Sequence, residues 1–328
     1  MIGLRFGAQV HVPAFRSDPR CVVTALAGRD LARTQSIAGE LGIRSCHADW
    51  RALVADTSID AVSIAVPPLE QGAIIVEAAR LGKHVFCEKP VAASIEDAER
   101  ALDCAQQAGV VHAIDFIFPE IPVWQRARRL LLDGAIGAPR HFSYSWHVQT
   151  FAARTRADSW KNRDQDGGGA RGNFLPHAIF NIEWLLGPLV RLDHVARDHS
   201  GEMSAFSDCI VYLDGGIHGS ISISTDAFLG EGHQLQIFGA SGTLVISNPT
   251  MDHASGFELR MGTITTGRLE LMERHEPSAN NDGRIAAVGR IVRRFVDGIL
   301  GGDPVTPNLE DGVRVQRWLG RIGDAARR

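Results

Sequence analysis

The sequence predicts an α/β protein with a Rossmann-type doubly wound parallel sheet, followed by a domain with a large, mainly antiparallel open sheet. Three observations predict this fold class. The 328 residues exceed the size at which one hydrophobic core keeps growing, so two domains are expected. Strand and helix patterns alternate as far as residue 116, and strand patterns dominate beyond it. We therefore expect a doubly wound α/β domain over residues 1–116 and a second, strand-rich domain over residues 117–328.

The elements of the first domain alternate regularly. The predicted strands are 21–27, 61–66, 84–87 and 110–115, and the predicted helices are 31–41, 50–55, 69–81 and 95–108. Strands separated by helices of about 10–15 residues are typical of a parallel sheet.

The second domain has strand patterns with glycine-containing turns between them, which favour antiparallel hairpins. The predicted strands are 140–150, 208–212, 216–225, 234–238, 242–247 and 269–274, and the predicted helices are 178–186, 284–300 and 310–326. Such an open sheet is suited to be the face of a homodimer or homotetramer.

Composition excludes several classes of protein. The net charge of −4 offers no basic surface for nucleic acid, and the apolar runs are too short to span a membrane. The amino terminus lacks a secretory pattern. The five cysteines form no CxxC pair, and His112, His141, His218, His233 and His275 lack metal-ligand spacing, so we expect neither disulfides nor a metal. Cys87 is interpreted as a core residue rather than a nucleophile, and a reducing cytoplasm is the expected compartment.

A glycine turn over residues 3–8 (GLRFGA) precedes a helical stretch. A dinucleotide fold needs small residues here so that backbone N–H groups approach the pyrophosphate. The small residues Gly3, Gly7 and Ala8 are therefore candidate cofactor contacts, together with Phe6 of the same turn. Arg5 occupies the second-glycine position of the GxGxxG/A fingerprint, so the match is incomplete. A generic glycine turn stays open as an alternative.

The end of the second predicted strand suggests the type of cofactor. Gly28 stands where an acidic residue would bind the ribose 2′-hydroxyl, and Arg29 follows with a guanidinium suited to a 2′-phosphate. Asp30 is interpreted as the N-cap of the next helix. NADP is therefore the expected cofactor, NAD stays possible, and the alternative for Arg29 is a solvated surface arginine.

Only Met1 and Ile2 precede Gly3, whereas a first Rossmann strand has about five residues. The first strand is thus expected to be truncated. Three interpretations stay open: Met1 is not the natural start, another segment fills the gap, or nucleotide binding is impaired. We favour the first, because the other motifs of the chain are largely intact.

Several motifs together resemble one family. Residues 82–90 (GKHVFCEKP) resemble the GKHVxxEKP signature of the glucose–fructose oxidoreductase/inositol dehydrogenase/rhizopine-catabolism (Gfo/Idh/MocA) family. Residues 60–68 (DAVSIAVPP) and 167–177 (GGGARGNFLPH) resemble its DAVxIAxPP and GGGxLxDxGxH motifs. Residues 184–187 and 310–312 also fit, so the resemblance covers most of the chain.

The resemblance implies hydride transfer between a nicotinamide and an oxygen-bearing carbon of a sugar, inositol or sugar derivative, with the active site between the two domains. It implies that residues 1–116 form a Rossmann dinucleotide-binding domain and residues 117–328 a substrate-binding and oligomerisation domain. It implies catalytic roles for Lys89, His177 and Asn173, the last of which replaces an aspartate that most members carry. It also implies cofactor contacts from Val66, Pro67, Gln71, Glu88 and Lys89. The implied substrate contacts are Lys89, Trp160, Asn173 and His177.

The chemistry of these residue types agrees with such roles. Histidine suits proton transfer because its pKa lies near neutrality, and Pro176 places His177 in the first turn of a helix. Lys89 ends a strand and can stabilise a developing alkoxide, while Asn173 can hydrogen-bond a hydroxyl. The alternatives are a structural histidine and a surface lysine paired with Glu88.

The glycine-rich residues 167–172 (GGGARG) are called the glycine block below. Four residues that precede this block are further candidates to contact a polyol: Trp146, His147, Arg156 and Trp160. Ordinary packing is the alternative. The sequence as a whole predicts an NAD(P)-dependent dehydrogenase or ketoreductase acting on CH–OH groups. The alternative is a non-catalytic relative that has lost or impaired cofactor binding.

Overall fold

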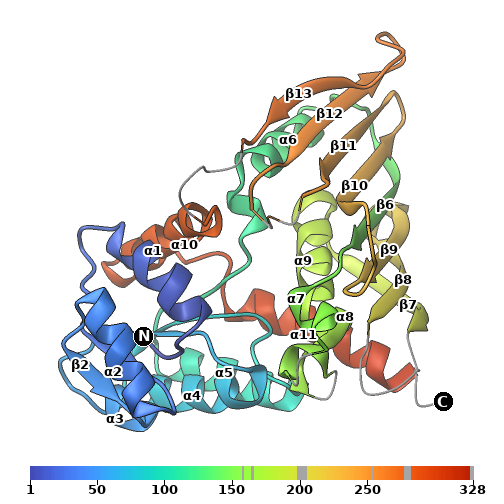
Figure 1. Ribbon diagram of the computed structural model, residues 1–328. Coiled ribbons are helices and arrows are strands. Elements are labelled where there is room, and N and C mark those ends of the chain that lie inside the picture. The colour runs from blue at the N-terminus through green and yellow to red at the C-terminus, as the bar shows by residue number, and fades with distance from the viewer. Residues whose placement is uncertain are drawn as a thin grey trace. The chain divides into compact units, whose positions relative to one another are not determined.

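The structure, a computed structural model, describes residues 1–156, 159–163, 166–197, 205–250, 252, 254–276 and 282–325. The chain forms two compact units (Figure 1). The first comprises Met1–Phe116 and Arg284–Arg317, and the second comprises Ile117–Gly283 and the chain from Trp318 onward. Residues 284–317, which the sequence pattern places in the second domain, therefore group with the first unit.

The first unit holds a parallel sheet of short strands. Among its described residues the strands are β1 (Ala25–Ala27), β2 (Ser45–His47), β3 (Ala61–Ile64), β4 (His84–Cys87) and β5 (His112–Ile114). Strand β1 pairs with β2, and β4 pairs with both β3 and β5, while Ile2 forms parallel bridges to both Ala27 and Ile64. Met1 and Ile2 thus occupy the position between β1 and β3. The short polar strand β2 was not predicted, because three residues are too few for a period-two pattern.

The helices of this unit begin near the predicted positions. They are η1 (Gly7–His11), α1 (Val12–Arg16), α2 (Leu31–Leu41), α3 (Trp50–Val54), α4 (Pro68–Arg80), α5 (Ile95–Gln107) and α10 (Arg284–Ile299), while α11 (Leu309–Ala325) spans the division between the units. Asp30 is the N-cap of α2, as predicted, and its carboxylate accepts the backbone N–H of Arg33 at 3.0 Å. The predicted end of α11 at residue 326 lies outside the described residues.

Helix α10 belongs to the first unit because its apolar face packs there. Phe295 is fully buried, and its ring makes edge contacts with Phe15 and Phe86 at centroid distances of 6.3 and 5.9 Å. Phe86 is a β4 residue, so α10 covers the sheet. Burying this aromatic cluster explains why a segment so distant in sequence joins the first domain.

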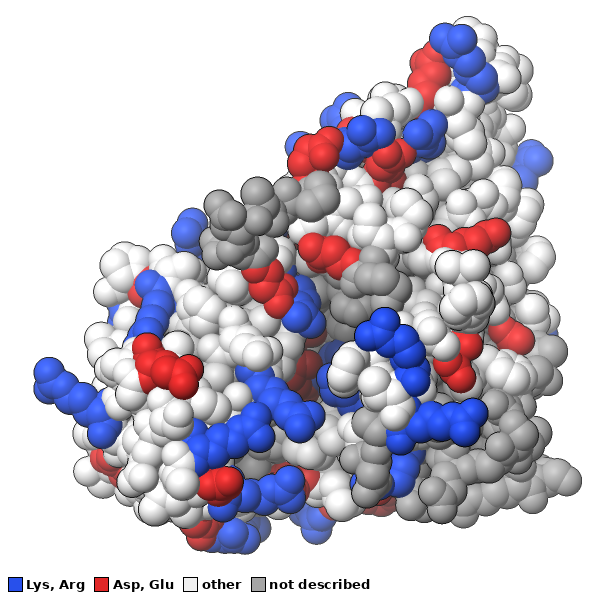
Figure 2. Space-filling view, in the orientation of Figure 1, with Lys and Arg blue, Asp and Glu red and all other residues white. Residues whose placement is uncertain are grey.

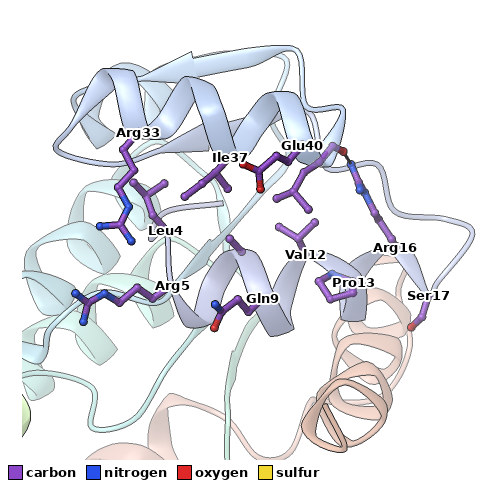
Figure 3. Close-up of a pocket in the computed structure, with 12 residues that line it drawn as sticks. Leu4, Arg5, Gln9, Val12, Pro13, Arg16, Ser17, Arg33, Ile37 and Glu40 are labelled. Atoms are coloured by element: carbon purple, nitrogen blue, oxygen red, sulfur yellow. Dashed lines mark hydrogen bonds between the residues drawn. The ribbon is translucent and has the colours of Figure 1, made fainter. Parts of the chain in front are cut away.

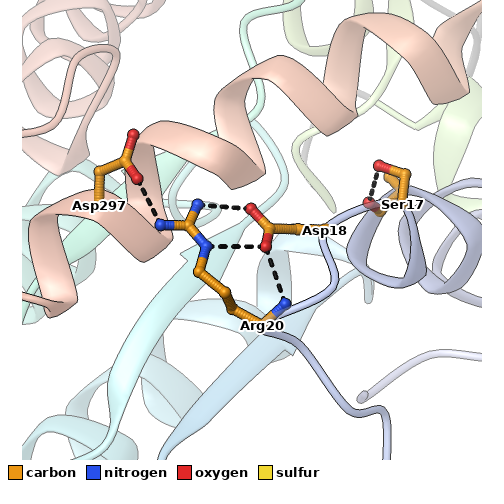
Figure 4. A network of polar contacts seen from close by, with 5 residues as sticks. Ser17, Asp18, Arg20 and Asp297 are labelled. Carbon is orange, nitrogen blue, oxygen red and sulfur yellow. Dashed lines mark hydrogen bonds and ion pairs between the residues drawn. The ribbon is translucent and has the colours of Figure 1, made fainter.

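An ion network joins α10 to the loop after α1 (Figure 4). The Arg20 guanidinium donates to both carboxylate oxygens of Asp18, at 2.9 and 2.6 Å, and to Asp297 of α10 at 2.7 Å. Asp18 is buried, and its side-chain hydrogen bond with Arg20 lowers its pKa to about 2. Bidentate geometry of this kind fixes orientation as well as charge.

The second unit is built on one large sheet. Its described strands are β6 (Pro139–His147), β7 (Leu189–Arg197), β8 (Phe206–Leu213), β9 (His218–Ser224), β10 (Gly232–Gly239), β11 (Gly242–Asn248), β12 (Glu258–Thr263) and β13 (Glu270–Arg274). Among them the order is β13-β12-β11-β10-β6-β9-β8-β7, and every neighbouring pair is antiparallel except β6 with β9. This confirms the predicted fold class. Strands β7 and β12 were not predicted, because charged residues interrupt their apolar runs.

One face of this sheet carries the core of the second unit. The described helices here are η2 (Phe118–Glu120), α6 (Pro122–Leu132), α7 (Phe151–Arg154), η3 (Trp160–Asn162), α8 (Gly169–Asn173), α9 (Leu175–Leu186) and η5 (Asp214–Gly216). Helices α6 and α9 lie along the sheet in Figure 1, and the inward-facing Tyr144 and Trp146 of β6 are buried. Helix α6 was not predicted, because three arginines dilute its apolar stripe of Val123, Trp124, Ala127 and Leu130.

The other face of the sheet carries small polar side chains. Ser143 and Ser145 of β6 and Ser220 and Ser222 of β9 are half-buried there. Lys and Arg side chains are interspersed with Asp and Glu over the visible face of the molecule (Figure 2). Of the described helices, none is both long enough and apolar enough to cross a membrane.

Candidate active site

The glycine turn is shaped by a close backbone approach. Gly3 has a φ of +120°, and a Cβ atom there would lie 2.2 Å from the carbonyl oxygen of Ala65. Only glycine fits this position. The chain then enters η1 at Gly7, so the turn leads directly into a helix as a dinucleotide site requires.

A groove of 610 Å³ runs between this first helical segment and α2 (Figure 3). Leu4, Val12 and Ile37 supply apolar lining, and Arg5 and Arg33 lie at the end where Leu4 is found. Neither Lys89 nor His177 lines this groove, so we do not place the reaction in it. Its basic end lies beside the glycine turn of residues 3–8.

Arg29 projects into solvent directly after β1. Its side chain is 85% exposed, and it forms an ion pair with Glu70 at 3.4 Å. Such an exposed pair contributes little to stability. The guanidinium is thus placed at the strand end where a Rossmann fold binds the adenosine ribose, next to Gly28.

The Glu88–Lys89–Pro90 segment follows β4 at the carboxyl edge of the parallel sheet. The backbone N–H of Glu88 donates to the carbonyl of Ile64 at 3.0 Å. Gln71 is buried, and its side-chain amide donates to the backbone carbonyl oxygens of Glu88 and Pro90, the latter at 2.8 Å. Gln71, expected beside the nicotinamide, therefore uses its donor to hold the backbone on both sides of Lys89.

A buried polar cluster lies beneath this segment. His11 of η1 is fully buried, with Nδ1 2.8 Å from Ser63 Oγ, and Nε2 3.2 Å from Glu88 Oε1 and 3.4 Å from Asp115 Oδ2. Burial lowers the pKa of His11, but its hydrogen bonds and charge interactions with Asp115 and Glu88 outweigh this and raise the value to about 9. Burial and the nearby Glu88 raise the pKa of Asp115 to about 7. The cluster thus binds a proton at neutral pH.

His11 and Asp115 were missed from the sequence. They are far apart in the chain, and neither belongs to one of the family motifs. The available signal was positional, since Ser63, Glu88 and Asp115 lie at or just beyond the carboxyl ends of β3, β4 and β5, which meet at one edge of a parallel sheet.

In the second unit the glycine block forms a compact turn around Trp160. A Cβ at Gly168 would lie 2.0 Å from the Trp160 carbonyl oxygen, and one at Gly172 would lie 1.9 Å from that of Gly167. The Asn173 side-chain amide donates to the Lys161 carbonyl at 2.8 Å. Asn173 and the Trp160 turn are thereby brought together, with Asn173 bound to backbone.

His177 is the third residue of α9, which begins at Leu175 rather than at the predicted 178. Its ring is nearly buried and meets the edge of Phe118 at a centroid distance of 5.1 Å, and Trp146 lies 6.1 Å away. Lys89 lies in the first unit and His177, Asn173 and Trp160 in the second. His147 is bonded to Ser222 at 2.9 Å on the polar face of the sheet, away from this group.

A parallel, Rossmann-type unit followed by a unit with a mainly antiparallel open sheet is the fold of a two-domain, dinucleotide-binding protein. The chain belongs to the Gfo/Idh/MocA oxidoreductases. Residues 1–116 match the oxidoreductase family with an NAD-binding Rossmann fold, and residues 124–245 match the GFO/IDH/MocA C-terminal domain. The resemblance seen in the sequence is thereby confirmed.

Relatives of known and unknown activity share this organisation. An uncharacterized oxidoreductase of Synechocystis sp. is 29% identical over 96% of this chain and 90% of its own length. The levoglucosan dehydrogenase of Pseudarthrobacter phenanthrenivorans is 30% identical over 57% of this chain and 50% of its own. A solved structure of levoglucosan dehydrogenase with NADH and levoglucosan superposes with a TM-score of 0.87 at 22% identity, covering 99% of this chain and 96% of that one.

Proposed function

We propose that the protein oxidises a CH–OH group, or reduces the corresponding ketone, on a sugar, inositol or sugar derivative. The observation that carries this proposal is the Glu88–Lys89–Pro90 segment, which the Gln71 side chain and the Ile64 carbonyl hold at the carboxyl edge of an NAD-binding sheet. Open α/β sheets bind ligands at that edge. The sugar-directed activity named for the levoglucosan relative supports the substrate class.

Lys89 and His177 are proposed to carry the polar chemistry. The Lys89 ammonium stabilises negative charge on the reacting oxygen, and the His177 imidazole takes or returns the hydroxyl proton. Asn173 and Trp160 are proposed substrate contacts. When bound, the nicotinamide supplies the hydride acceptor or donor.

The residues of the first unit fit such a cofactor. The turn that contains Gly3, Phe6, Gly7 and Ala8 leads directly into a helix. Arg29 follows strand β1, and its guanidinium is exposed. Val66 and Pro67, which precede α4, and Glu88 are the further proposed contacts. Because no carboxylate stands at Gly28, we propose that NADP is preferred to NAD.

Two broader assignments also stay proposals. The half-buried polar face of the large sheet is proposed to form a homodimer or homotetramer. The five cysteines are all free thiols in the structure, which agrees with a reducing cytoplasm.

The experiment begins with cofactor binding, which is monitored by intrinsic tryptophan fluorescence during titration with NADPH and with NADH. Reduced-cofactor absorbance is then recorded with levoglucosan, myo-inositol and D-xylose as alcohols. We expect His177→Ala and Lys89→Ala to lower kcat by about 10²–10⁴-fold with little change in cofactor Kd. If neither cofactor binds, the result supports the alternative interpretation, in which the protein is a non-catalytic family member that has lost cofactor binding. A normal kcat in either variant removes the substituted residue from the mechanism.

A further inference from the structure

We propose that His11 is a positioning residue for Lys89. As an imidazolium it binds the carboxylates of Glu88 and Asp115, and so sets both the place and the charge environment of the Glu88–Lys89 segment. The inference rests on the proposed function, which gives Lys89 its part in the reaction. It assigns a task to a buried group that no motif indicated.

The geometry joins three strands to one ring. His11 Nε2 lies 3.2 Å from Glu88 Oε1 and 3.4 Å from Asp115 Oδ2, and the two acids directly follow β4 and β5. On its other side Nδ1 lies 2.8 Å from Ser63 of β3. The rings of Phe6 and Phe86 contact the imidazole by their edges, each at 5.2 Å. A ring held from so many directions has one orientation.

The charges explain why the ring is an imidazolium. The buried Asp115 carboxylate and the partly buried Glu88 carboxylate repel each other, and one proton on Nε2 offsets both charges. Among the described residues, the charges of Glu88 and Asp115 raise the pKa of His11, and the charges of His11 and Lys89 lower the pKa of Glu88. His11, Glu88 and Asp115 are also close enough to hold a metal ion. A proton and a metal exclude each other at Nε2, and we infer the proton.

A purely structural cluster would be an inefficient way to build this core. Replacing a buried set of charges by apolar side chains of similar volume is often neutral or stabilising. Phe6 and Phe86 already border the ring, so an apolar residue at position 11 would have apolar neighbours. What the charges add is control of Glu88, the residue covalently joined to Lys89.

Two clamps therefore converge on the same segment. Gln71 holds the backbone carbonyls on either side of Lys89, and His11 holds the Glu88 side chain. Lys89 already acts on Glu88 through its charge. Without the imidazolium, Glu88 loses its other cationic partner, so its negative charge acts more strongly on the neighbouring Lys89 ammonium. An opposite charge nearby favours the charged form of a lysine, so Lys89 would become harder to deprotonate.

The basicity of Lys89 is measured by competitive acetylation of the intact protein and peptide mass spectrometry. The midpoint is the pH at which half of the Lys89 amine is deprotonated and reactive. We expect His11→Phe and His11→Gln to raise the Lys89 midpoint by about one pH unit, with the smaller rise in His11→Gln, which keeps a neutral donor. Glu88→Gln removes the carboxylate and should lower the midpoint. His84→Gln, a histidine at the start of β4 outside the cluster, is the matched control and should leave it unchanged.

Labelling curves of the His11 and Glu88 variants that superimpose on the wild-type curve overturn the proposal. Should His11→Phe fail to fold, His11→Gln and Glu88→Gln decide the question by the opposite signs of their shifts. One equivalent of zinc in the purified protein, lost in His11→Gln, also overturns it, because a metal then replaces the proton. The readout needs no sugar substrate, so a normal kcat in Lys89→Ala would reject the proposed function without affecting this test.

Discussion

At the scale of single residues, Arg29 is the side chain that we propose to select the cofactor. Its guanidinium is exposed, and its partner Glu70 is also partly exposed, so the pair can be exchanged for a stronger partner at little cost. A 2′-phosphate offers charge-assisted hydrogen bonds that a 2′-hydroxyl does not.

We expect Arg29→Asp to shift the ratio of Kd values for NADPH and NADH towards NADH by about 10–100-fold, because a charge-assisted contact is replaced by repulsion. Fluorescence titration measures both constants. Arg16→Asp is the control. Arg16 lines the groove beside the glycine turn, but its guanidinium donates to the Leu41 carbonyl at 2.6 Å and is not proposed to contact the cofactor. Wild-type protein that binds NADH more tightly than NADPH would contradict the assignment.

At the scale of elements, helix α10 is attached to the first unit by the Asp18–Arg20–Asp297 ion network as well as by aromatic packing. Asp18 is 4% exposed and bound by Arg20, which also binds Asp297 of α10. The pKa of Asp18 is depressed to about 2, below its ordinary value of 3.8. Its contribution to stability is therefore present above pH 3.8 and lost as the pH falls towards 2.

Asp18→Asn should lower the free energy of unfolding at pH 7, and the difference from wild type should shrink as the pH falls from about 4 to about 2. Urea unfolding followed by circular dichroism over that range measures the difference. Asp133→Asn, at an exposed position after α6, should leave stability unchanged. A difference that stays constant through this pH range would contradict the assigned role of Asp18.

The glycine block is the second element-scale feature, because it leaves no room for side chains. Gly172→Ala would bring a Cβ within 1.9 Å of the Gly167 carbonyl oxygen, so the backbone that carries Asn173 must move. We expect a loss of about 2 kcal/mol or more in unfolding free energy, together with a lower kcat. Thermal denaturation and steady-state assays measure the two effects.

Gly320→Ala is the matched control, since among the described residues no atom outside its chain neighbours and its own helix backbone lies within 4 Å of the Cβ it would add. A helix-interior alanine there should stabilise by about 0.5–1 kcal/mol. Unchanged stability and turnover in Gly172→Ala would show that the block tolerates displacement.

At the scale of the whole molecule, the open face of the eight-stranded sheet is the surface proposed for self-association. Ser145 lies near its centre, paired with Ser222 of β9 and Gln234 of β10. Small side chains let two sheets approach closely.

Ser145→Arg should therefore reduce the oligomer to a monomer in size-exclusion chromatography with light scattering, because a bulky cation would be buried at the interface. Asp133→Arg, which lies after α6 and away from this face, should keep the wild-type mass. A monomeric wild type, or a Ser145→Arg variant of unchanged mass, would refute the proposed interface.

The linear motifs supplied most of the proposed site residues. The EKP and GGG segments point to Lys89 and His177, and the end of β1 points to Arg29, because each of these signals lies within a few consecutive residues. Periodicity located most strands and helices for the same reason. Helix α6 and strands β7 and β12 escaped, since charged residues dilute their patterns and only tertiary packing decides which face is buried.

What local sequence determines here is therefore the type of most elements, the glycine turns and the residues at strand and helix ends that we propose for the reaction. Only the tertiary structure decides which distant residues meet. It brings His11, Glu88 and Asp115 together because the parallel strands end at one edge, and it joins α10 to the first unit through Phe295 and Asp297. Such contacts depend on packing and charge pairing between segments far apart in the chain, and neither is encoded in a local pattern.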